Sequence, residues 1–103
     1  MWAQMISFSV KPGREGEVAQ LAEKLRATEQ PGGGLVRSTM FQDQKDPSRF
    51  HTVVVFESEE RARARESDER REEALVEVRQ LMAELFEGPP QFVDLVVVAE
   101  YTL

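Results

Sequence analysis

The segment from Phe50 to Glu60 constrains the fold more than any other part of the chain. Its first seven residues, which end at Phe56, are rich in Val and Phe and include three consecutive Val. This run predicts a β-strand with both faces covered, because a strand with one wet face alternates apolar and polar residues. Ser58 then offers an N-cap oxygen, and the acidic pair after it suits the positive end of a helix dipole. The segment therefore predicts a buried strand that leads directly into a helix.

The rest of the chain predicts three more strands and further helices. Apolar residues alternate at period two in the first segment, whereas Val18, Leu21 and Leu25 recur at the spacing of a helical stripe. Strands are expected at 2–10, 35–42 and 91–101, a helix at 14–30, and a helical region at 59–87 that breaks near 67–68. The order β-α-β-β-α-β is that of a ferredoxin-like α+β fold, a four-stranded antiparallel sheet with helices on one face.

Length and charge restrict the class of protein. The 103 residues are expected to form one domain, residues 1–103. The net charge of −6 disfavours binding to nucleic acid or to an anionic membrane. The chain has no Cys, which excludes disulfides and thiol catalysis. No signal peptide and no membrane span is recognisable, so we expect a cytoplasmic protein.

The predicted sheet has two apolar faces, which predicts a partner. The strands at 50–56 and 91–101 are apolar at both odd and even positions. The helices of the chain can cover only one face, and a large exposed apolar face usually marks an interface. We therefore expect a homodimer in which two sheets pack face to face. The alternative is that loops cover the second face or that it stays partly wet.

His51 is the one side chain whose ordinary pKa lies near neutrality. Pairing of 35–42 with the strand at 50–56 would place His51 and Arg37 on one face, with His51 as a base and Arg37 as an anion clamp. The residues expected to bind a phenolic substrate are Ser7, Ser9, Thr39, Phe41 and Tyr101. Tyr101 is alternatively an interface residue. In the alternative, His51 only caps the hairpin, half exposed, and Arg37 pairs with a carboxylate.

Three other patterns carry no site. The Gly32-Gly33-Gly34 run precedes a strand and lacks the Lys of a phosphate loop, so it is expected to end a helix. The arginines of 59–73 are interleaved with acidic residues, as on a solvated helix. The acidic residues show no metal-ligand spacing, and no metal is expected.

Three junctions give the chain a family resemblance. Val10-Lys11-Pro12-Gly13, Pro31-Gly32-Gly33 and Phe56-Glu57-Ser58-Glu59-Glu60 resemble the corresponding segments of the antibiotic biosynthesis monooxygenases. The resemblance extends over nearly the whole chain. It implies a dimeric α+β barrel, a pocket for a small hydrophobic molecule in each subunit, and oxygenation of an aromatic substrate without a cofactor.

Two classes of function follow. The first is a cofactor-independent monooxygenase that acts on a small aromatic or phenolic substrate. The second is a non-catalytic homodimer that binds a small ligand or has a structural role. Oxygenases of the family use Asn and Trp in the pocket, whereas this chain has no Asn and has Phe56 at the position where relatives often carry Trp. This difference favours the second class.

Overall fold

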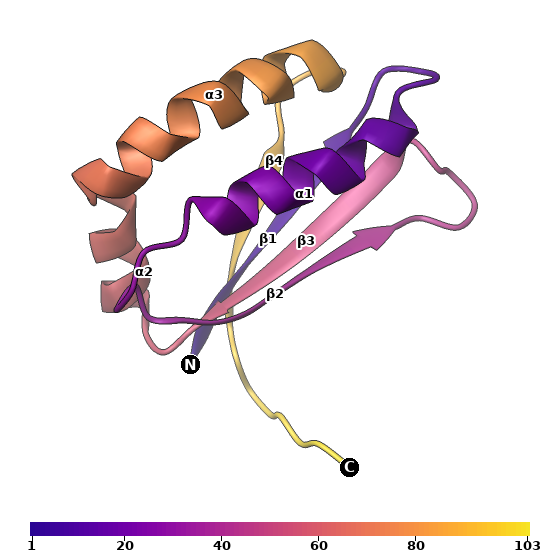
Figure 1. Cartoon of the computed structure of the whole chain (residues 1–103). Coiled ribbons are helices and arrows are strands. Elements are labelled where there is room, and N and C mark those ends of the chain that lie inside the picture. Colours follow the sequence, from indigo (N-terminus) through magenta and orange to yellow (C-terminus); the bar gives the residue numbers. More distant parts are fainter.

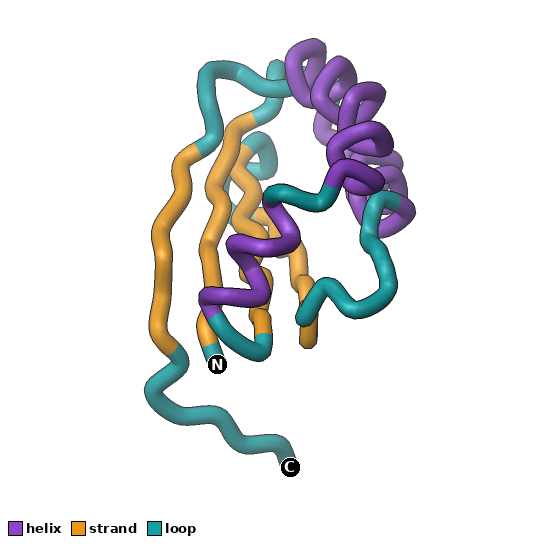
Figure 2. The backbone as a smooth tube through the Cα atoms, turned by 90° about the vertical axis from the view of Figure 1, so that its left-hand side faces the viewer, coloured by secondary structure: helices purple, strands orange, loops and turns teal.

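The strand β3 (Arg49–Phe56) lies inside a four-stranded antiparallel sheet, between β1 (Trp2–Ser9) and β2 (Leu35–Gln42). The computed structural model describes all 103 residues. The fourth strand, β4 (Gln91–Val96), pairs with the other side of β1, so the order across the sheet is β2-β3-β1-β4. The helices lie on one face of this sheet (Figures 1 and 2). The predicted ferredoxin-like α+β fold is confirmed.

The helices differ from the prediction mainly at their ends. The first helical region is a 3-10 turn, η1 (Glu15–Glu17), followed by α1 (Val18–Ala27), which is shorter than the predicted 14–30. It ends early because the Thr28 hydroxyl donates a 2.7 Å hydrogen bond to the carbonyl of Leu25 and competes with a further turn.

The predicted break near 67–68 is confirmed. It separates α2 (Glu59–Glu66) from α3 (Glu69–Leu85). Ser58 caps α2 through a hydrogen bond from the amide of Arg61, and Asp68 caps α3 through one from the amide of Arg70. The Arg70 guanidinium also donates to the Asp68 carboxylate and, with the amide, lowers the pKa of Asp68 to about 2.

The core consists of three apolar clusters between the sheet and the helices. Trp2, Val54, Phe56 and Ala62 form the first, under α2. Phe8, Val10, Val18 and Phe50 form the second, under the start of α1. Leu21, Leu75, Val78 and Leu85 form the third, between α1 and α3. All the buried strand residues in these clusters have even numbers, so the even-numbered face of the sheet is the helix-covered face.

β4 is the least covered strand. It ends at Val96, not at residue 101 as predicted, because Val96 pairs with Trp2 and β1 extends no further. On the helix-covered face Phe92 is 60% exposed and Val96 is 77% exposed. The helices lie on this face but leave these side chains of β4 largely uncovered. The segment after Val96 is not part of the sheet and passes below the end of it (Figure 1), where Glu100 contacts Arg37 of β2. None of the helices is long and apolar enough to cross a membrane.

Gly34 should be one of the least replaceable residues of the turn before β2. It adopts φ +79°, and a Cβ there would lie 2.6 Å from the Cβ of Arg61 in α2. The left-handed conformation costs a non-glycine residue roughly 1–3 kcal/mol, and the contact adds to this cost. We expect Gly34→Ala to lower the free energy of unfolding by more than Gly13→Ala, since Gly13 has φ +84° but open space around it. Urea unfolding measures both variants, and equal losses of unfolding free energy in Gly34→Ala and Gly13→Ala would contradict the contact with Arg61.

Candidate functional site

The odd-numbered face of the sheet carries most of the predicted site residues. Ser7 of β1 and Phe41 of β2 both pair with His51 of β3, from opposite sides. Directly paired residues point to the same face of a sheet. Ser7, His51 and Phe41 therefore form one row across three strands, on the face that the helices leave open. This face is called the open face below.

Ser7 and His51 are in direct contact. The Ser7 Oγ and the His51 Nδ1 are 2.7 Å apart, Ser7 is only 6% exposed, and His51 is half-buried. When Nδ1 carries the proton it donates to the hydroxyl, which leaves Nε2 free to accept a proton from a substrate. The contact orients the ring, and an oriented imidazole is the arrangement that a general base requires.

Arg37 lies away from this contact. It pairs with Val55 and stands four residues from Phe41 along β2, which is about 13 Å of strand. Its Nη1 forms a 3.0 Å ion pair with Glu100 of the C-terminal segment. The structure thus does not bring Arg37 and His51 together, and Arg37 has the carboxylate partner that the alternative interpretation expected.

Arg49 is the cation that the sequence analysis missed. It is the first residue of β3, two positions from His51 on the open face, or about 7 Å along the strand. Its guanidinium donates to the Ser9 hydroxyl at 3.1 Å and to the Gln91 side-chain oxygen at 3.0 Å, and it has no carboxylate partner. The predicted strand begins one residue later, at Phe50, although the odd-even alternation of the strand continues through Arg49.

The other predicted residues differ in their distance from His51. Thr39 and Phe41 share the open face with it, and Phe41 is 51% exposed beside it. Tyr101 lies in the C-terminal segment and is exposed, next to the Glu100 that contacts Arg37. The structure therefore gathers Ser7, Ser9, Thr39 and Phe41 with His51 but does not bring Tyr101 to it.

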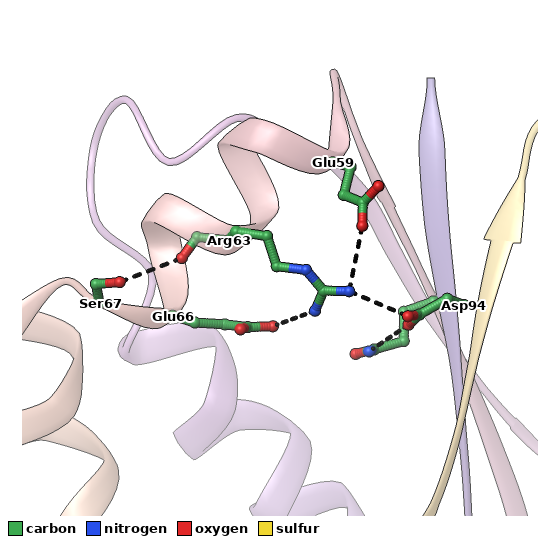
Figure 3. A network of polar contacts seen from close by, with 6 residues as sticks. Glu59, Arg63, Glu66, Ser67 and Asp94 are labelled. Atoms are coloured by element: carbon green, nitrogen blue, oxygen red, sulfur yellow. Dashed lines mark hydrogen bonds and ion pairs between the residues drawn. The ribbon is translucent and has the colours of Figure 1, made fainter.

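A charged network closes one end of the opposite face. The guanidinium of Arg63 in α2 lies 5.0 Å from the centre of the Trp2 ring. It also pairs with Asp94 of β4 at 3.0 Å, with Glu66 at 3.1 Å and with Glu59 at 3.3 Å (Figure 3). The hydrogen bond to Asp94 is the main cause that raises the pKa of Arg63. The network connects α2 to an otherwise poorly covered β4.

Two open hollows lie on the helix side of the molecule. The larger, about 420 Å³, lies between the end of α3 and the start of β4 and is lined mainly by Met82, Ala83, Phe86 and Pro90, with Arg79 at its edge. The smaller, about 290 Å³, lies between the start of α1 and the strands β2 and β3, beside Met40 and Phe50. Neither contains His51. No group of His, Asp or Glu side chains has the arrangement of a metal site.

The family model of antibiotic biosynthesis monooxygenase matches residues 1–75. The chain belongs to the antibiotic biosynthesis monooxygenase family. The matched part contains the three strands that bring Ser7, Phe41 and His51 together and ends before β4. No curated protein matches the chain.

Solved structures of the family superimpose over nearly the whole chain. A candidate antibiotic biosynthesis monooxygenase from Nitrosomonas europaea has a TM-score of 0.76 at 17% identity, over 96% of this chain and 100% of that chain. One from Bordetella bronchiseptica has a TM-score of 0.74 at 26% identity, over 95% of this chain and 98% of that chain. SnoaB from Streptomyces nogalater, a cofactor-independent oxygenase, has a TM-score of 0.74 at 15% identity, over 96% and 94%. These superpositions establish the shared fold.

Replacing Ser7 should change the tautomer of His51. Ser7→Ala removes the one side chain that contacts Nδ1, so the proton should redistribute between the two ring nitrogens. We expect the NMR chemical shifts of the ring nitrogens to change in Ser7→Ala and to stay as they are in Ser9→Ala, whose hydroxyl contacts Arg49. Unchanged shifts in Ser7→Ala would show that the contact does not hold the ring in solution.

Proposed function

We propose that this chain catalyses the cofactor-independent oxygenation of a small aromatic or phenolic substrate on the open face of its sheet. The observation that carries the proposal is the 2.7 Å contact between Ser7 and His51, with Arg49 two residues away on the same face. This arrangement combines an oriented base with a cation that has no carboxylate partner. The likeness in fold to SnoaB supports the reaction class.

The proposed reaction begins with a proton transfer. The Nε2 of His51 removes a proton from the substrate, and Arg49 holds the resulting anion. The electron-rich anion reacts with O₂, which is the oxidant, so no redox cofactor enters the step. At a methylene group between aromatic rings, two C–H bonds break and one oxygen atom forms a ketone. The other oxygen atom leaves as water with the two hydrogens.

A substrate anion needs a site from which water is excluded, and the open face of a single chain does not exclude it. Phe41 is 51% exposed there, Val93 is 44% exposed and Leu95 is 36% exposed. We propose that a second copy of the chain covers this face, so that two sheets enclose His51 between them. Such a homodimer would bury the exposed apolar side chains and exclude water from the same surface.

A non-catalytic homodimer is the second candidate. The observation that favours it is that neither hollow contains His51, together with the absence of Asn from the chain. In that case the covered face holds a small hydrophobic ligand without converting it. Binding of an anthrone without oxygen uptake would support this candidate.

Val93→Glu should dissociate the dimer. The substitution introduces a charge on the open face, and a two-fold interface contains it twice without a partner. We expect the wild type to be a dimer at micromolar concentration by light scattering and Val93→Glu to be monomeric. The matched control is Val76→Glu, because Val76 is 56% exposed on α3, away from the open face. A monomeric wild type would refute the dimer.

His51→Gln should abolish most of the oxygenation. Gln retains a hydrogen-bonding side chain but cannot act as a base, and loss of a general base lowers kcat by about 100- to 10,000-fold. Arg49→Gln should lower activity as well, whereas Gln44→Ala, in the exposed turn before β3, should not. Oxygen uptake with a panel of anthrones and hydroquinones measures all three variants. Uptake by His51→Gln at the wild-type rate would refute the assignment of the base.

A further inference from the structure

Arg71, in the first turn of α3, is a half-buried arginine whose side chain forms neither an ion pair nor a hydrogen bond. Its Nε is buried and has no hydrogen-bond partner, and its guanidinium forms no ion pair. A guanidinium stays protonated at any physiological pH. A partly desolvated charge without a partner is costly, so its presence requires an explanation.

The neighbouring carboxylates are engaged by other arginines. Arg65 of α2 forms a forked ion pair with Glu29, and Arg79 of α3 forms one with Glu72, at 3.0 and 3.1 Å. The group therefore contains the guanidiniums of Arg65, Arg71 and Arg79 but only two carboxylates, which leaves one positive charge unpaired. That surplus is notable in a chain whose net charge is −6.

The position of Arg71 explains its burial. It lies one helical turn before Leu75, which is buried in the cluster between α1 and α3, so both side chains point to the same side of α3. This is where the ends of α1 and α2 meet the start of α3, and the contact between Arg65 and Glu29 crosses the same junction. Burial lowers the pKa of Arg71, and the charge of Arg65 lowers it further.

We propose that Arg71 anchors a binding site for a small oxyanion, a carboxylate or phosphate group, at this junction of three helices. The planar guanidinium of the half-buried side chain binds two oxygens of such a group at once through its two Nη groups, which neutralises the surplus charge. The site lies on the helix side of the sheet, whereas His51 lies on the open face. It is therefore independent of the proposed oxygenase reaction.

Arg71 could otherwise share a carboxylate that is already engaged. Glu29 and Glu72 both raise its pKa by their charge, so both lie within electrostatic reach. Moving to either would take the carboxylate from Arg65 or Arg79 and transfer the unpaired charge to that residue. An anion from solution neutralises the unpaired positive charge of Arg71 and leaves both existing ion pairs intact.

Thermal unfolding in matched salts tests the site. Wild-type protein in sodium phosphate or sodium acetate should have a higher Tm than in sodium chloride of the same ionic strength, because an anion that binds only the folded state stabilises it. Arg71→Met should lose this anion-specific increase. Arg26→Met, which removes an exposed arginine of α1, should retain it. An increase with phosphate alone identifies a phosphate site, and one with both salts identifies a carboxylate-type site.

Two further measurements keep the test independent of how well the variant folds. In sodium chloride, Arg71→Met should be at least as stable as the wild type, because it removes an unpaired charge. In the wild type, the NMR signal of the Arg71 Nε–H should shift saturably as phosphate or acetate is added. The absence of both an anion-specific increase in Tm and an NMR shift in the wild type would overturn the proposal. An equal increase in Arg71→Met would also overturn it.

Discussion

The pairing of β3 with β1 on one side and β2 on the other is the constraint on which the rest of the structure depends. Because successive residues of a strand point to opposite faces, this pairing separates β3 into two sets of side chains. Phe50, Val54 and Phe56 point toward the helices, and His51 and Val53 point to the open face. A slip of one residue would exchange the sets and place an imidazole in the apolar core.

The same register determines which polar groups meet. His51 contacts Ser7 because the two residues are directly opposite each other, and Arg49 meets Ser9 in the next pair on that face. Arg37 shares the face but lies two pairs further along, where the C-terminal segment supplies Glu100. Sharing a face is thus necessary for two side chains to act together, but position along the strand decides whether they do.

The arginines on the helix side have a second organising role. Most of them pair with a carboxylate from another turn or another element, as Arg63 does with Asp94 and Arg65 with Glu29. Isolated surface ion pairs contribute little to stability, but these connect helices to a strand and to each other where apolar contacts are few. Arg71 departs from this pattern, since its burial is not matched by a partner.

The sequence by itself determined the order of the elements, the break before Asp68 and the odd-numbered residues that share a face with His51. These features follow from local patterns, namely alternation, capping residues and runs of Gly and Pro. Only the tertiary structure decided that β4 ends at Val96, that Arg49 and not Arg37 lies near His51, and that Arg71 lacks a counter-ion. Each of these depends on which residues of distant segments lie side by side. A pattern within one segment does not determine how close that segment lies to another.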